Sequence, residues 1–174
     1  MVKRTEIEEL TRAVTARCVS FLQEEMGLAV EAVTCQLKGV TRLVLRDLTA
    51  LVSVGGSPGV YIAFSFDEPA IRYIFRTYTH DLNLDPEQEA QHMAKTAADV
   101  VNTIVGNALA KVHGQIAAIS MTPPVVLAET KSLVIHRDAY FYLVDVRTNL
   151  GDIDIMYIGP KALFDEMLQP VRNA

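Results

Sequence analysis

The chain has 174 residues, of which half are hydrophobic and 21% are charged, and its net charge is −5 at neutral pH. This composition excludes a disordered chain, and the length suits a single domain that spans residues 1–174. The acidic balance excludes a broad basic surface for nucleic acid or anionic lipid, and no stretch approaches the ~20 apolar residues that cross a bilayer.

The first half of the chain predicts a long helix, a strand pair and a short helix. Apolar residues recur every three or four positions over residues 5–26, which predicts a helix that ends at Gly27. Its apolar face consists of Ile7, Leu10, Val14, Cys18, Phe21 and Leu22. Residues 41–56 and 60–68 are rich in β-branched and aromatic residues around a Gly/Pro turn, so we predict an antiparallel hairpin. Pro69 then opens a short helix over residues 69–79.

The second half predicts the same order of elements. A long helix over residues 86–114 ends at Gly114, strand candidates follow at 117–123, 132–148 and 152–159, and Pro160 opens a last helix. The glycines that close the two long helices are 87 positions apart, and the two prolines that open the short helices are 91 apart. We therefore predict an α+β fold in which internally duplicated helix–hairpin–helix units form an antiparallel sheet packed with long helices.

One stretch of the second long helix, DVVNTIVGNAL at residues 99–109, carries polar residues opposite its apolar face. At 100° per residue, Asp99, Asn102, Thr103 and Gly106 fall on one arc, and Asp99 and Asn102 are surface neighbours. A glycine in a helix costs about 1 kcal/mol relative to alanine. Two interpretations are open: a solvated face on which Gly106 serves helix packing, or a low surface that another molecule approaches closely.

The stretch and its surroundings resemble the CheC/CheX/FliY family of chemotaxis phosphatases, and CheX-like proteins in particular. The signature of that family is a carboxylate, two residues, an Asn, and a Gly four positions later, in a helix that lies on a sheet. Asp99, Asn102 and Gly106 stand at those positions, and a segment with Pro123 and Pro124 follows.

This chain departs from the family pattern in two places. Asp99 replaces the usual Glu, which is one methylene longer, and the residues after the double proline lack the expected glycine. The first half cannot carry the motif, because the first Asn of the chain is Asn83. We therefore expect at most one catalytic site.

The resemblance implies a hydrolase that removes the aspartyl phosphate from a CheY-like receiver domain of a response regulator, as in chemotaxis and other two-component signalling. It implies that Asn102 orients the attacking water and that Asp99 pairs with the active-site Lys of the receiver. Thr103 and Gly106 would face the partner. No cofactor or metal of its own is implied, and Mg²⁺ is expected on the phosphorylated receiver.

The resemblance also implies a homodimer joined through sheet edges, for which residues 139–146 are a candidate edge strand. A non-catalytic CheX-like module that binds a signalling partner and dimerises stays open, because Asp99 replaces Glu. A small-molecule-binding domain is a third possibility, although the sequence shows no convergent polar cluster. We expect neither nucleic acid nor membrane as a partner.

The remaining reactive residue types do not point to other chemistry. The four histidines, His80, His92, His113 and His136, lack the spacing of metal ligands. Asp152 and Asp154 alternate along a strand, which predicts an exposed or edge-facing row. Cys18 and Cys35 are expected to be reduced and buried in a cytoplasmic protein, since the N-terminal sequence lacks the apolar core of a signal peptide.

Overall fold

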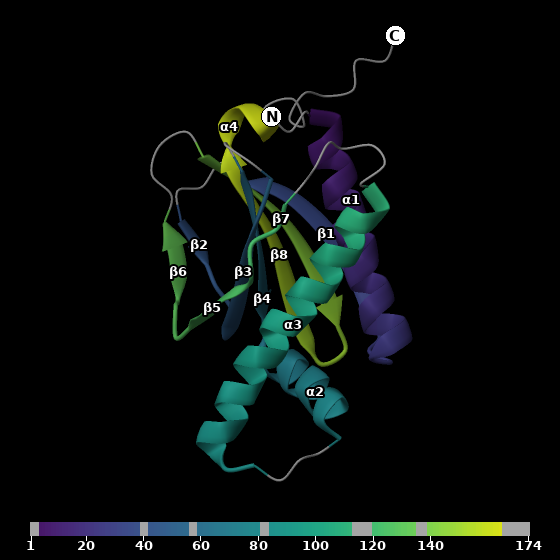
Figure 1. The fold of residues 1–174 in the computed structure, drawn as a ribbon, viewed down its shortest axis with the longest axis vertical. Helices are drawn as coiled ribbons and strands as arrows, with labels where there is room; N and C mark the ends of the chain where they lie inside the picture. The colour runs from purple at the N-terminus through teal and green to yellow at the C-terminus, as the bar shows by residue number, and fades with distance from the viewer. Residues whose placement is uncertain are drawn as a thin grey trace.

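One antiparallel sheet organises the fold, and two long helices, α1 and α3, cross one of its faces (Figure 1). The computed structural model describes residues 4–38, 42–55, 59–80, 84–112, 120–134 and 139–164. No helix within these ranges has both the length and the apolar character that a membrane crossing needs.

The two halves of the chain contain the same order of elements. The first half has α1 (Arg4–Ser20), the π-helix η1 (Phe21–Glu25), β1 (Val30–Lys38), β2 (Arg42–Val44), β3 (Leu48–Val54), β4 (Val60–Phe66) and α2 (Glu68–Thr79). The second half has α3 (Pro86–Val112), β5 (Val125–Ala128), β6 (Ser132–Val134), β7 (Ala139–Thr148), β8 (Gly151–Pro160) and α4 (Lys161–Phe164). A helix, four strands and a helix therefore occur twice.

The sheet interleaves strands from both halves. Its order is β1-β7-β8-β4-β3-β5, with antiparallel neighbours throughout, and β2 pairs with β6 in a separate ribbon. The sheet order stays the same when β1 is exchanged with β5, β7 with β3 and β8 with β4. The α+β class and the antiparallel sheet are thus confirmed, and a duplication of one ancestral unit stays a prediction.

The helical periodicity identified the buried face of α1 correctly. All six residues of its predicted apolar face, Ile7 to Leu22, are at most 1% exposed. The helix ends through η1 at Gly27, whose φ of 65° lies in the left-handed region that favours glycine. Strands β3 and β4 form the predicted hairpin, and α2 begins at Glu68, one residue before the predicted start at Pro69. Gly114 lies outside the described residues, so the predicted end of α3 there stays a prediction.

Strand pairing differs from the sequence prediction at three places. Strand β1 was not predicted, because its alternation is weak and most of its described residues are exposed. The stretch 41–56 was predicted as one strand but contains two, of which β2 leaves the sheet to pair with β6. Strand β7 lies between β1 and β8, so the prediction that residues 139–146 form a sheet edge is wrong.

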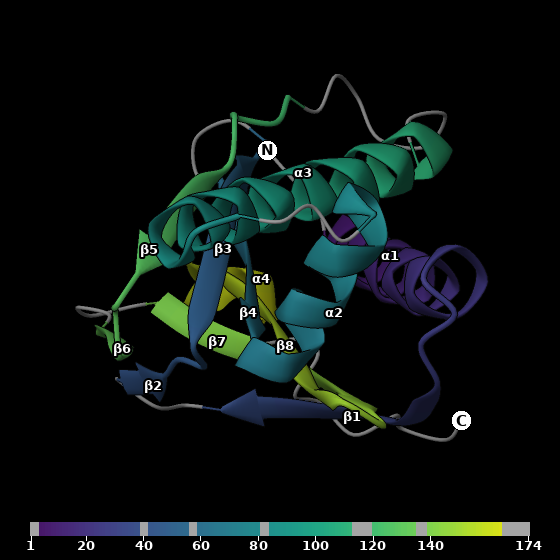
Figure 2. The same cartoon turned by 90° about the horizontal axis from the view of Figure 1, so that it is seen from below.

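Two hydrophobic cores lie on opposite faces of the sheet. The larger core packs α1 and α3 on the sheet, while the smaller one packs the β2–β6 ribbon on the other face (Figure 2). Leu43 of β2 and Leu133 of β6 contact this smaller core around Phe141 and Met156. Cys18 is buried in the larger core, but Cys35 is exposed on β1, which corrects the prediction that both thiols are buried. Both described cysteines are free.

A single arginine joins the ends of three strands and the start of α2. The Arg46 guanidinium lies 3.0 Å from both carboxylate oxygens of Asp67, which precedes α2, and 3.0 Å from Asp154 of β8. Asp152 is 3.7 Å away. Asp152 and Asp154 are therefore half-buried partners of Arg46 on an interior strand, and the prediction of an exposed or edge-facing row is wrong.

Candidate functional site

The candidate site lies on the solvent face of α3. Two reciprocal hydrogen bonds at the N-terminus define where this helix begins. The Asp85 carboxylate accepts a hydrogen bond from the Gln88 backbone N–H at 2.9 Å, and the Gln88 side chain accepts one from the Asp85 N–H at 3.4 Å. This capping box satisfies backbone donors at the helix start. The apolar face of the helix is buried through Ala97, Val101 and Val105, so the opposite face is turned to solvent.

The four predicted site residues lie together on that outward side. Asp99 and Asn102, one helical turn apart, are exposed, and Thr103 and Gly106 are half-buried. A Cβ atom added to Gly106 would meet no atom within 4 Å. Internal packing therefore does not account for this glycine, and of the two interpretations the open approach surface fits better.

A hollow of about 370 Å³ separates this part of α3 from the segment 121–124. Ala98, Asp99 and Asn102 line it on the helix side, and the segment supplies the opposite wall. The predicted strand over residues 117–123 is only an isolated bridge at Met121 within the described residues, and β5 starts after the two prolines. Proline has no backbone N–H, so Pro123 and Pro124 cannot donate to a strand ladder.

Hydrogen bonds to β3 hold this opposite wall in place. The Thr122 backbone N–H donates to the Ser53 carbonyl at 3.0 Å, and the Ser53 N–H donates to the Thr122 hydroxyl at 3.0 Å. Gly55 N–H donates to the Ser120 carbonyl at 2.9 Å. Both walls of the hollow are therefore held in place. Helix α3 packs on the core through its apolar face, and the segment 121–124 is hydrogen-bonded to the sheet. Sequence reasoning noted the prolines but not Thr122, since its role depends on a pairing 69 residues away.

Asp99 also interacts with Tyr78 of α2, which belongs to a cluster of aromatic and charged residues from α1, η1 and α2. Tyr78 is 44% exposed, and its pKa is raised by burial and then by the carboxylates of Glu25 and Asp99. Its ring stacks on Phe21, and Arg17 forms an ion pair of 2.6 Å with Glu25. Local sequence patterns could not group these residues with Asp99, because they come from three other helical segments.

The described residues contain no group of three or more His, Cys, Asp or Glu side chains that could hold a metal ion. The chemistry available at the hollow is thus one carboxylate, one carboxamide and a surface open to a partner. A carboxamide can orient water or donate a hydrogen bond, and a carboxylate can pair with a cation.

Comparisons with known proteins identify a matching family and solved structures of similar fold. The family described as "Chemotaxis phosphatase CheX" matches residues 48–145. The fold is similar to CheX from Desulfovibrio desulfuricans, with a TM-score of 0.72, 16% identity, and coverage of 86% of this chain and 97% of that chain. CheX from Vibrio vulnificus has a TM-score of 0.64, 16% identity, and coverage of 86% and 97%.

A chain in the CheX–CheY–BeF3–Mg²⁺ complex from Borrelia burgdorferi is also similar in fold. Its TM-score is 0.61 at 18% identity, with coverage of 88% of this chain and 97% of that chain. A search of curated protein sequences finds no match. The matched family region contains the whole candidate site, from β3 through α3 to the double proline and into β7.

Proposed function

The chain belongs to the CheX family of chemotaxis phosphatases, and on that premise we propose that it hydrolyses the aspartyl phosphate of a CheY-like receiver domain. One observation carries the proposal: Asp99 and Asn102 lie side by side, exposed, at a hollow between α3 and the segment 121–124. The CheY partner and Mg²⁺ in the Borrelia burgdorferi complex agree with this assignment.

Asn102 is the residue that orients the attacking water. The reaction adds water to phosphorus, breaks the bond between phosphorus and the aspartyl oxygen, and releases inorganic phosphate and a free carboxylate. The carboxamide neither attacks nor transfers a proton, since it has no titratable group at neutral pH. Holding the water in line reduces its orientational entropy, as a water-positioning glutamine does in GTPases.

Asp99 is the residue that docks the receiver. Its exposed carboxylate would pair with the active-site Lys of the receiver, which fixes the register of α3 over the phosphorylated residue. Asp is one methylene shorter than the Glu usual in the family, so this pair needs a closer approach of the two backbones. The open space at Gly106 permits that approach. Mg²⁺ belongs to the phosphorylated receiver, and this chain supplies no cofactor.

The shorter Asp99 side chain supports one alternative, a CheX-like module that binds a receiver without catalysis. The two functions are separated by following the phosphate released from a phosphorylated CheY-like receiver in Mg²⁺, with and without the chain. Acceleration that scales with chain concentration supports the phosphatase. Binding without acceleration, for every receiver from the same genome, supports the module instead.

The charge of Asp99 sets receiver affinity. For Asp99→Asn, which keeps the shape but removes the charge, we expect the receiver concentration at half-maximal rate to rise about tenfold. Asp99→Glu keeps the charge and should stay within about threefold of the wild type. Steady-state phosphate release at two salt concentrations measures both. Equal half-maximal concentrations for the wild type and Asp99→Asn would remove Asp99 from the docking contact.

We infer further that the chain forms a homodimer along β1. This strand is nine residues long and forms one edge of the sheet, whereas the other edge, β5, has four residues. Long unpaired edges readily pair with another chain. Light scattering should give twice the 19.2 kDa chain mass. Val33→Lys on β1 should weaken the dimer about tenfold, while Val125→Lys on β5 should not; the opposite pattern would assign the interface to β5.

A further inference from the structure

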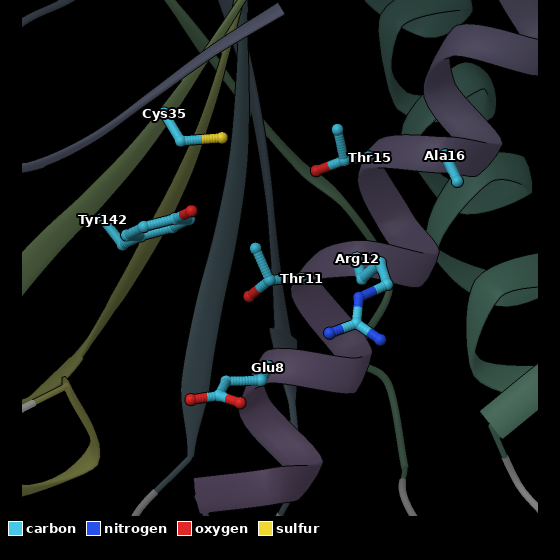
Figure 3. Close-up of a pocket in the computed structure, with 7 residues that line it drawn as sticks. All are labelled: Glu8, Thr11, Arg12, Thr15, Ala16, Cys35 and Tyr142. Carbon is cyan, nitrogen blue, oxygen red and sulfur yellow. The ribbon is translucent and has the colours of Figure 1, made fainter. Parts of the chain in front are cut away.

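A second hollow lies beside α1, between this helix and the strands β1 and β7 (Figure 3). Its volume is about 420 Å³, and α1 lines it from Glu8 to Ala16 while the strands contribute Cys35 and Tyr142. Sites for small molecules commonly have volumes of roughly 300–1,000 Å³ and mostly apolar walls with a few polar groups. This hollow meets both criteria, because its volume falls within that range and its accessible lining is mainly apolar.

Two threonine hydroxyls of α1 line this hollow, and one of them lacks a hydrogen-bond partner in the described part of the chain. Within the described residues the Oγ1 atom of Thr11 is buried without a hydrogen-bond partner, and Thr11 as a whole is 6% exposed. The Thr15 hydroxyl, one turn later, is next to the buried phenol of Tyr157 and interacts with it. Helical threonines usually donate to the carbonyl four residues earlier, as Thr77 and Thr79 do in α2 at 3.0 and 2.9 Å. Figure 3 shows both α1 hydroxyls turned toward the strands. Buried polar groups without partners are rare in native proteins and call for an explanation.

The strand side of the hollow is aromatic and supplies another hydroxyl. The Tyr142 ring lies 5.9 Å from the ring of Tyr157, whose hydroxyl donates to the Thr11 carbonyl at 3.3 Å. Burial, and then a hydrogen bond with the neighbouring Cys35 thiol, raise the pKa of the Tyr142 phenol. Tyr142 therefore keeps its proton at neutral pH. Figure 3 shows its hydroxyl turned toward the hollow, where a ligand acceptor would compete with the Cys35 thiol for this donor.

The charges at the hollow balance. Glu8 and Arg12 lie one helical turn apart on its helix side and have opposite signs. An anionic ligand would meet the Glu8 carboxylate, and a cationic ligand would meet the Arg12 guanidinium. The interior groups are neutral hydroxyls, so the ligand that suits them is uncharged and offers a hydrogen-bond acceptor.

This hollow occupies the place in the first half that corresponds to the candidate site in the second. A shift of 87 positions brings the buried Leu10, Val14 and Cys18 of α1 onto the equally buried Ala97, Val101 and Val105 of α3. The same shift brings the three α1 residues Thr11, Arg12 and Thr15 onto the three α3 residues that line the candidate site, Ala98, Asp99 and Asn102. Arginine in place of the carboxylate repels a receiver lysine, so the α1 hollow requires a different ligand.

We propose that the α1 hollow binds a small, planar, uncharged organic molecule with a carbonyl group, which accepts a hydrogen bond from the unpaired Thr11 hydroxyl and lies between Thr15 and Tyr142. The ring of the ligand would rest on the apolar walls between α1 and the strands. This site is separate from the phosphatase site on α3, and its occupancy does not depend on a receiver.

The test uses the chain alone and three probes of one shape, namely uncharged benzamide, anionic benzoate and cationic benzylamine. In NMR titrations, benzamide should shift the Thr11 and Thr15 methyl signals and saturate at millimolar concentration, while the two charged probes should bind about tenfold more weakly. No saturable shift with benzamide, or equal binding of a charged probe, would overturn the proposal.

Two variants with matched controls locate the binding. Ala16→Phe, at an exposed position that lines the hollow, should fill it and abolish the benzamide shifts, whereas Ala110→Phe on the exposed side of α3 should not. Thr11→Val removes the unpaired donor without changing shape and should weaken binding roughly three- to tenfold, while Thr77→Val should not. Unchanged benzamide binding in Ala16→Phe would place the probe elsewhere and contradict the inference.

Discussion

Replacement of Asn102 by alanine is expected to lower the accelerated hydrolysis of receiver phosphate about 100-fold or more. The exposed side chain makes no contribution to the core, and alanine is a better helix former than asparagine, so the fold of α3 should persist. Asp99 remains available to dock the receiver, so the receiver concentration at half-maximal rate should change by less than about threefold. Phosphate release and receiver binding, measured on the same preparation, separate these two effects.

Asn107 provides the matched control for this prediction. It is also an exposed asparagine of α3, but it does not line the hollow beside Asp99. Asn107→Ala should therefore keep the wild-type rate. An Asn102→Ala variant that hydrolyses as fast as the wild type would remove Asn102 from the reaction, and the binding module would then be the better description.

Replacement of Arg46 by methionine is expected to lower the free energy of unfolding by about 3 kcal/mol. The substitution keeps an unbranched apolar side chain but leaves Asp67, Asp152 and Asp154 facing one another without a cation. These carboxylates connect β8 to the start of α2, and the side chain of Asp154 is only 13% exposed. Urea denaturation measures the loss, which should appear as a lower midpoint with an unchanged slope.

The loss in Arg46→Met should shrink as the pH falls. Burial raises the pKa of Asp154 in the wild type, while Arg46 opposes that rise, so removing Arg46 should raise this pKa further. A carboxyl whose pKa is higher in the folded than in the unfolded chain binds more protons when folded. Its contribution to stability is complete below the unfolded pKa and is lost as the pH rises through the folded pKa. The deficit should thus be larger at pH 7 than at pH 5.

Arg72 supplies the comparison for this effect. It pairs with Glu68 and Glu89 on α2 and α3, where its own side chain is 31% exposed and that of Glu68 is 56% exposed. Exposed pairs contribute about 0–1 kcal/mol, so Arg72→Met should have a small effect with little pH dependence. An Arg46→Met variant as stable as Arg72→Met would show that the Asp67–Asp154 cluster does not need its cation.

The sequence alone determined the features that depend on local periodicity and turn chemistry. Spacings of three and four placed Ile7 to Leu22 inside and Asp99 and Asn102 outside, because helix geometry fixes which residues share a face. Gly27 marked the C-terminal end of the first helical segment and Pro69 marked the start of α2, because the backbone preferences of glycine and proline act within a few residues. The motif on α3 and the family resemblance were readable for the same reason.

Only the tertiary structure decided which segments meet. A strand has a side-chain period of two whichever partner it takes, so sequence could not assign β1 to β7 or remove β2 from the sheet to pair with β6. The Arg46 cluster joins residues up to 108 positions apart. Both hollows likewise depend on long-range packing: Thr122 is hydrogen-bonded to β3 opposite Asn102, and Tyr142 lies across the hollow from Thr11 and Thr15. Local preferences formed the two helices, and the pairing of distant strands placed a wall opposite each of them.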